Sequence, residues 1–373
     1  MLGIGYIQFK AFLSELTNMQ SATLGGQAKI RYPWMLSCQE DLLYFLAPNL
    51  LALIIYLVVL ASPWGFAGAI TLMVIFYAGN VIHQGATWFH YTDKRNREYY
   101  FGTARQRFKF IVLPILVLAL SIIGGFIWFP LVWLVYMGWS LPHFIQQNAG
   151  ILLLYHNHRQ GEAIVPRNIE MRSQQLSGLF FYLVAIHRFS LSGTDVALGS
   201  LILCCIVGVA AAASIVLYLS NLFSQVRSGA YLNVPAFLFW IASILFFLPF
   251  ALPRIGDFEV CWILPSLMHW LQYIGLNYVL VRRKYAEPEH LQDLPTKRPI
   301  AFFVGFCTVI LIIQYGGFVF AHFAWPEKPY LNIWSSVFLG LGMVHYLLDG
   351  FIWKFREPYL RETILTYLVE KKT

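Results

Sequence analysis

Charged residues are scarce in this chain, because Asp, Glu, Lys and Arg make up 12% of its 373 residues. An ordinary soluble domain carries roughly 25%. The composition therefore excludes a water-soluble globule and a disordered chain of this length. The mean hydropathy is +0.62, and 58% of the residues are hydrophobic. These residues fall in long runs, which is typical of a protein that crosses a bilayer several times.

Several motifs of well-known chemistry are also missing. The sequence has no HExxH, no GxxxxGK[ST] and no GxSxG, which argues against a zincin-type protease, a P-loop ATPase and a hydrolase with a nucleophile elbow. The five cysteines form no CxxC pair, and four lie in apolar runs. We therefore expect buried thiols rather than a disulfide framework or a zinc ribbon. No basic segment followed by an apolar run opens the chain, so we expect no cleavable signal peptide.

The order of apolar runs predicts an all-α membrane bundle with three parts. Residues 1–41 form a cytoplasmic or interfacial segment, in which apolar residues from Tyr6 to Leu16 have the spacing of an amphipathic helix. Residues 42–354 form the transmembrane bundle, and residues 355–373 form a basic cytoplasmic tail. Pro130 and Gly199 predict tight connections between spans. The ten expected spans, each near the ~20 residues that a bilayer requires, are residues 42–61, 66–90, 110–128, 130–157, 176–198, 199–220, 233–251, 258–281, 300–324 and 331–353.

The distribution of basic residues predicts the orientation of these spans in the membrane. If the N-terminus is cytoplasmic, 23 of the 26 Lys and Arg residues fall on the cytoplasmic side, whereas Arg254 and Lys328 fall opposite and Arg188 falls inside a span. This bias predicts that both termini are cytoplasmic. The net charge of +8 is then explained by membrane topology rather than by binding to nucleic acid. We expect an integral, multi-pass protein of a bacterial-type inner or plasma membrane.

Five of the ten histidines fall at a similar depth on five different spans. We estimate the depth of each histidine by counting residues to the nearest basic residue at the cytoplasmic end of its span, with a rise of about 1.5 Å per residue. Four of the histidines then lie roughly 14–24 Å deep, near the middle of a ~30 Å core. Ionisable side chains at this depth are rare and usually functional. The five are His83, His143, His269, His345 and, on the fifth span, His187.

Three of these spans share a local pattern. A polar side chain follows the histidine three or four residues later, so both lie on one helix face. The polar partners are Gln146 and Gln147 after His143, Gln272 after His269, and Asp349 after His345. On the second span, Thr87 follows His83 by four residues and His90 follows it by seven, about 10 Å along the helix axis.

This pattern predicts a metal ion held between helices, because neutral imidazole is a ligand for iron, copper and zinc. We expect His83, His143, His269 and His345 as ligands, with Asp349 as a ligand or an outer carboxylate. His90 would serve a second nearby ion or an outer position, and His187 is a further candidate. The glutamines Gln146, Gln147 and Gln272 would orient ligands or substrate. The alternative is that each histidine makes only a hydrogen bond between helices.

Arg188 is the other unusual residue, since a charge inside a membrane needs a partner. Asp349 is the only acidic residue expected deep in a span, so the two side chains would form an ion pair. The alternative is that the planar guanidinium of Arg188 anchors a carboxylate or phosphate of a substrate.

The histidine distribution resembles that of the His-rich polytopic non-haem-iron oxygenases, namely the membrane desaturases and hydroxylases and the bacterial β-carotene dioxygenase type. The desaturase boxes HxxxH and HxxHH are replaced here by His83-x6-His90 and His156-Asn157-His158. The resemblance implies O2-dependent oxidation of a hydrophobic, lipid-like substrate with iron as cofactor and copper as an alternative. The expected partners are the bilayer, that substrate and an external electron donor.

Two other functions are compatible with the same residues. Two deep histidines are suited to be axial ligands of haem, with Arg188 near a propionate. The histidines could also relay protons in a transporter, whose fourth and eighth spans would be interrupted by Pro142 and Pro265.

Overall fold

A computed structural model of the protein describes residues 30–48, 50–51, 54, 79–156, 161–251, 258–324 and 328–369. Almost all of the regular structure in this part of the chain is helical, so the predicted all-α class is confirmed. The exception is a pair of two-residue parallel strands, β1 (Ile30–Arg31) and β2 (Leu232–Asn233). The amphipathic helix expected near residues 6–16 and parts of the spans expected at 42–61 and 66–90 lie outside the described residues.

The chain divides into two compact units, which we call the first and the second unit. The first unit comprises Met1–Ala69 and Phe144–Met268, and the second comprises Ile70–His143 and His269–Thr373. Two long helices, α7 (Leu113–His156) and α11 (Phe258–Lys284), contribute residues to both units.

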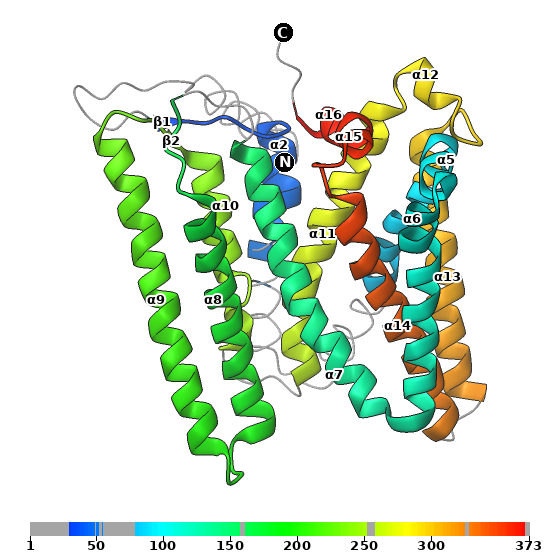
Figure 1. Ribbon diagram of the computed structural model, residues 1–373, viewed down its shortest axis with the longest axis horizontal. Helices are drawn as coiled ribbons and strands as arrows, with labels where there is room; N and C mark the ends of the chain where they lie inside the picture. Colours follow the sequence, from blue (N-terminus) through cyan, green and yellow to red (C-terminus); the bar gives the residue numbers. More distant parts are fainter. Residues whose placement is uncertain are drawn as a thin grey trace, which may run out of the picture. The chain divides into compact units, whose positions relative to one another are not determined.

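In the first unit, α8 and α9 lie side by side as a helical hairpin (Figure 1). Gly193 in the connection between them has φ = 88°, a conformation that favours glycine. This unit contains the two strands and parts of α7 and α11. Its other described elements are α2 (Cys38–Asp41), η1 (Leu42–Leu46), α8 (Arg167–Ile186), η4 (His187–Leu191), α9 (Ala197–Arg227), α10 (Val234–Leu245) and η5 (Leu248–Phe250).

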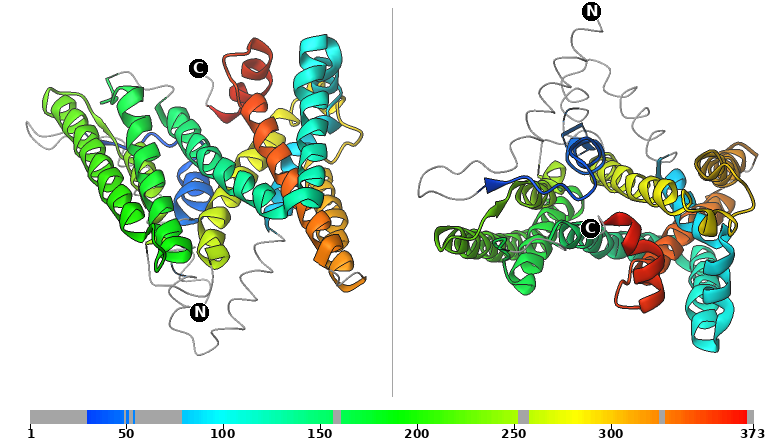
Figure 2. Two further views of the ribbon diagram at one scale, coloured as in Figure 1. Left: turned by 60° about the horizontal axis from the view of Figure 1, so that its bottom comes forward. Right: turned by 90° about the horizontal axis from the view of Figure 1, so that it is seen from above.

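In the second unit, α13 and α14 lie side by side (Figures 1 and 2). The short helix α12 precedes α13 in the chain, and the short helices α15 and α16 follow α14. Residues 79–89 form the helix that carries His83. The other described elements, besides its parts of α7 and α11, are η2 (His90–Thr92), α5 (Lys94–Gly102), α6 (Ala104–Arg107), η3 (Phe108–Val112), α12 (Pro288–Leu291), α13 (Pro299–Ala324), α14 (Lys328–Ile352), α15 (Pro358–Leu360), η6 (Arg361–Leu365) and α16 (Thr366–Leu368).

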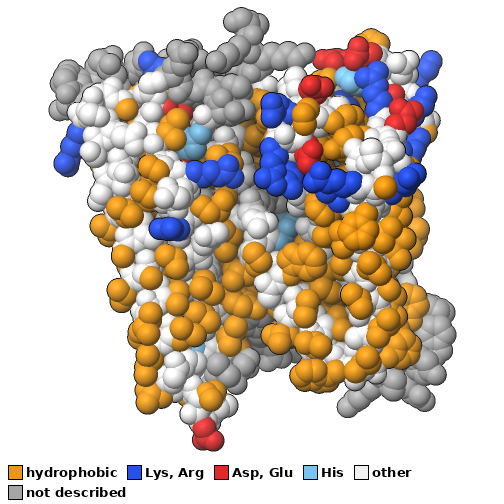
Figure 3. All heavy atoms as spheres, in the orientation of Figure 1, with side chains coloured by type: hydrophobic (Ala, Val, Ile, Leu, Met, Phe, Trp, Pro, Cys, Tyr) orange, Lys and Arg blue, Asp and Glu red, His pale blue; other side chains and the backbone are white. Residues whose placement is uncertain are grey.

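Four helices in the described part of the chain are long and apolar enough to cross a membrane. They are Ala104–His156, Ala197–Arg227, Pro299–Gly317 and Ile333–Ile352. On the second unit, apolar side chains cover the helices, and Lys and Arg side chains gather near the short helices at one end (Figure 3). This distribution is that of a membrane protein.

Helix boundaries agree with the sequence in one place and differ in two. The backbone at Trp128 is non-helical, with φ −160° and ψ 91°, and so interrupts α7 beside Pro130, where we predicted a connection. The connection predicted at Gly199 is wrong, because Gly199 lies inside α9 and the chain turns earlier, around Gly193. Helix α8 begins at Arg167, before the predicted span at 176–198, because polar residues of its first half are buried against other helices. A hydropathy criterion does not detect such residues.

A buried ion pair between Asp93 and Lys284 joins the segment after the His83 helix to the end of α11. Asp93 caps α5 by accepting a hydrogen bond from the Asn96 N–H at 2.9 Å. Lys284 Nζ lies 2.8 Å from Asp93 Oδ2, and the two side chains are 3% and 0% exposed. The Tyr285 hydroxyl donates to the same oxygen at 2.6 Å. Burial raises the pKa of the Asp93 carboxyl, but the charge of Lys284 and these hydrogen bonds outweigh burial and lower the pKa below its usual 3.8.

Candidate metal centre

Four buried imidazoles from four helical segments converge inside the second unit. His83 comes from residues 79–89, His143 from α7, His269 from α11 and His345 from α14. Their exposed fractions are 1%, 6%, 0% and 0%. Ring centroids lie 4.4 Å apart for His83 and His345, 4.7 Å for His143 and His269, and 5.1 Å for His83 and His269. The structure thus brings together the four histidines at the centre of the predicted site.

The closest approach in this cluster is between two ring nitrogens, His143 Nε2 and His269 Nε2, which lie 3.2 Å apart. Two neutral imidazoles at this distance can share one proton, or both can direct a lone pair at a cation. With metal–nitrogen bonds of ~2.0–2.1 Å in a tetrahedral site, two ligand nitrogens lie ~3.3 Å apart. The observed separation therefore fits both a hydrogen bond and a shared ion.

Asp349 adds a carboxylate one helical turn after His345. Its Oδ1 atom accepts hydrogen bonds from the Tyr273 hydroxyl at 2.7 Å and the Thr87 hydroxyl at 3.0 Å. Its Oδ2 atom lies 4.0 Å from His143 Nε2. Thr87 Oγ1 also lies 2.6 Å from His345 Nδ1 and 2.7 Å from the Tyr273 hydroxyl. A compact hydrogen-bond network therefore borders the imidazoles on one side.

The donor set fits a metal ion. Two groups of three side chains each offer ligand atoms that all lie within 4.8 Å of one another. In addition, His83 Nε2 and His345 Nε2 are buried and have no hydrogen-bond partner among the described residues. A buried polar atom left without a partner costs about 1–3 kcal/mol, and an ion bound by such a nitrogen would remove that cost. The first group is His83, His269 and His345, and the second is His143, His345 and Asp349.

Aromatic rings restrict how these imidazoles can turn. Trp270 stacks on His83 with centroids 5.6 Å apart and planes at 26°, and Tyr346 lies 4.3 Å from His143 at 30°. The Trp270 ring also packs against the backbone at Gly79, where a Cβ atom would lie 2.5 Å from it. Glycine at position 79 therefore lets Trp270 approach the His83 helix closely.

The other predicted site residues of the second unit lie beside the cluster. His90 is outside both ligand groups, and its Nε2 lies 3.0 Å from Asn277 Oδ1. Gln272 is fully buried on α11, three residues after His269. His90 therefore has the environment of a hydrogen-bonding residue, whereas Gln272 shares the buried helix region of the imidazoles.

The remaining predicted site residues belong to the first unit. Gln146 is exposed and Gln147 is half-buried. His187 Nδ1 lies 2.7 Å from Ser200 Oγ. Arg188 donates to the Phe250 carbonyl at 3.4 Å, and its guanidinium lies 5.9 Å from the centre of the Phe189 ring. These four residues thus belong to a different unit from the imidazole cluster.

Thr87 and Tyr273 were not predicted as site residues, although both contact Asp349. Thr87 follows His83 by four residues, and Tyr273 follows His269 by the same interval. Residues four apart share a helix face, so this spacing was the available signal. The spacing of Thr87 from His83 was noted in the sequence, but neither hydroxyl group was assigned a role in the predicted site.

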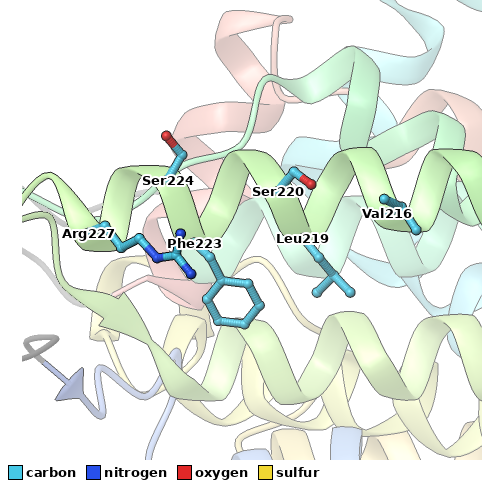
Figure 4. A pocket seen from close by; sticks show the side chains of 6 residues that line it. All are labelled: Val216, Leu219, Ser220, Phe223, Ser224 and Arg227. Atoms are coloured by element: carbon cyan, nitrogen blue, oxygen red, sulfur yellow. The ribbon is translucent and has the colours of Figure 1, made fainter.

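A groove of about 420 Å³ lies along the surface of α9 in the first unit (Figure 4). It contains none of the predicted site residues. Its lining consists of Val216, Leu219, Ser220, Phe223, Ser224 and Arg227.

In the first unit, the half-buried His156 lies between two carboxylates. His156 Nδ1 lies 2.5 Å from Glu162 Oε1, and its Nε2 lies 3.2 Å from Glu170 Oε2. Asn233 Nδ2 donates to the same Glu162 oxygen at 2.9 Å. Because the two carboxylates face opposite ring nitrogens, they connect α7 to α8 through the imidazole rather than surround a common point.

Comparison of the chain with models of protein families, with curated proteins and with solved structures finds no match. The assignment of a function must therefore rest on the residues of the site.

Proposed function

We propose that the protein is a multi-pass membrane metalloenzyme that binds iron through buried histidines and oxidises a hydrophobic, lipid-like substrate with O2. The reaction would be a hydroxylation, a desaturation or a cleavage. The observation that carries the proposal is the convergence of four buried imidazoles, two of which have an Nε2 without a hydrogen-bond partner among the described residues.

The proposed membrane arrangement is ten spans with both termini in the cytoplasm. The four long apolar helices and the placement of the basic residues support it. In this arrangement the imidazole cluster lies within the hydrocarbon layer, which is where an apolar substrate is concentrated.

His83, His143, His269 and His345 would hold the ion through neutral ring nitrogens, and Asp349 would contribute the nearest negative charge. When bound, iron with an open coordination position supplies the binding and activation of O2. Trp270 and Tyr346 fix ring orientations and help to exclude water from the centre.

The close packing of the imidazoles favours a single small ion over haem. In five of the six pairs, the ring centroids are separated by 4.4–6.1 Å. A porphyrin inserted between two axial histidines would have to displace the other two rings. The absence of a CxxC pair from the sequence agrees with an external electron donor.

We retain from the sequence the proposals that Arg188 binds a carboxylate or phosphate of a substrate and that Gln146, Gln147 and Gln272 orient ligands or substrate. His187 would support Arg188 from the same helical segment. A transporter that uses the same polar residues is the competing function, and it would require no metal.

Elemental analysis of the detergent-purified protein tests the proposal. Wild-type protein should carry stoichiometric iron and lack a Soret band. His83→Ala should lose the metal, whereas His90→Ala should retain it, since His90 belongs to the same stretch of chain but bonds to Asn277. Metal-free wild-type protein that transports a solute in liposomes would support the transporter instead.

A further inference from the structure

We propose that Thr87 is a positioning residue that fixes the tautomer of His345, so that only His345 Nε2 is available to bind an ion. This inference rests on the proposed function, since it specifies how one ligand of that same site is held. It assigns roles to Thr87, Tyr273 and Asp349 that do not require any of them to bind the metal.

The number of protons in the network leads to this assignment. The hydroxyl oxygen of Thr87 has three polar neighbours, at 2.6 Å (His345 Nδ1), 2.7 Å (Tyr273 hydroxyl) and 3.0 Å (Asp349 Oδ1). It carries a single proton to donate. Asp349 Oδ1 is an acceptor and receives protons from both hydroxyl groups.

With the Thr87 and Tyr273 protons both directed at Asp349, no hydroxyl proton remains for the contact of 2.7 Å between the two hydroxyl groups or for the contact of 2.6 Å between Thr87 and His345. Of these two contacts, the second can take its proton from another group, the imidazole. His345 Nδ1 is therefore the protonated ring nitrogen and donates to Thr87 Oγ1. In a neutral imidazole the other nitrogen then carries the lone pair. This nitrogen, Nε2, is buried and has no hydrogen-bond partner in the described part of the chain. The network thus leaves the lone pair on the ring nitrogen of His345 that has no hydrogen-bond partner among the described residues.

The assignment also fixes the number of ions. The two groups of candidate ligands share His345. An imidazole that donates through Nδ1 cannot bridge two metals, so His345 can serve only one ion. Asp349 Oδ1 is already occupied by two hydroxyl donors. With His345 serving one ion, only His143 and Asp349 of the second group remain, which are too few ligands for a separate site. We therefore expect one ion per chain, with Asp349 holding the network through Oδ1.

Substitution of Thr87 tests this proposal. Thr87→Val removes the hydroxyl group with little change in shape, and Thr87→Ser keeps it. Loss of a group that orients a metal ligand typically lowers affinity about 10–100-fold. We expect Thr87→Val to weaken Co²⁺ binding by this factor, in competition with a chromophoric chelator, and to alter the visible spectrum of the bound Co²⁺. Thr87→Ser should restore both. Tyr273→Phe, which deprives Asp349 of one donor, should weaken binding in the same direction.

Each result has a distinct meaning. Wild-type protein that binds neither Co²⁺ nor iron would refute the proposed function itself. If the wild type binds one ion and Thr87→Val matches it in affinity and spectrum, the role of Thr87 is refuted while the metal site stands. Two ions per wild-type chain would refute the single-ion assignment. If Thr87→Val does not fold, Thr87→Ala is measured in the same way, and it should show the same loss relative to Thr87→Ser.

Discussion

The buried ion pair between Lys284 and Asp93 allows a quantitative prediction about stability. Lys284→Met leaves the Asp93 carboxylate with hydrogen bonds from Tyr285 and Asn96 but without an opposite charge. The two side chains are 3% and 0% exposed, so little solvent screens the loss. Removal of one partner from such a pair typically costs about 3–5 kcal/mol. We expect a loss of this size for Lys284→Met and a comparable loss for Asp93→Asn.

The double variant Lys284→Met/Asp93→Asn removes both charges and should lose much less than the sum of the single losses. The measurement is the free energy of unfolding in mixed micelles at pH 7. Lys94→Met is the matched control, because its partner Glu98 lies 3.9 Å away and the two side chains are 66% and 64% exposed. Its effect should be below about 1 kcal/mol. Strictly additive losses, or equal losses in Lys284→Met and Lys94→Met, would refute the reasoning.

Two further predictions concern the second unit. The pKa of Asp93 is lowered in the folded protein, so the contribution of Asp93 to stability is present above its usual pKa of 3.8 and is lost as the pH falls through the folded pKa. The melting temperature of the wild type should therefore decrease below about pH 4. Asp93→Asn should lack this acid-induced decrease. On α14, Gly340→Ala places a Cβ atom 2.8 Å from Ser121 Cβ, and such overpacking should cost about 1–3 kcal/mol. Gly350→Ala on the same helix meets no atom within 4 Å and should be neutral or stabilising by up to about 1 kcal/mol; equal unfolding free energies for the two variants would contradict the packing argument.

The helical class followed directly from the composition and from the long apolar runs. The interruption near Pro130 was also predictable, since proline lacks the N–H that a continuous helix uses. The start of α8 was not, because Glu170, Ser173 and Gln174 are polar in the sequence but buried in the fold. Their burial depends on neighbouring helices, which hydropathy does not describe.

For the candidate site, counting from the basic ends of the spans selected five histidines, of which four meet in the second unit, whereas His187 belongs to the first. Such counting gives depth along a helix, but it gives neither the direction in which a side chain points nor its partner. His90 was grouped with His83 for this reason, although it bonds to Asn277. The role of the hydroxyl groups depends on contacts between distant segments, such as the one between Thr87 and Asp349, and no spacing within one helix reveals those.

The metal content of the purified protein tests the central claim most directly. Elemental analysis of wild-type protein, together with His83→Ala and His90→Ala, should give one iron per chain for the wild type and His90→Ala, and none for His83→Ala. The optical spectrum should show no Soret band. Wild-type protein without a stoichiometric transition metal, after reconstitution with Fe²⁺ under anaerobic conditions, would contradict the account.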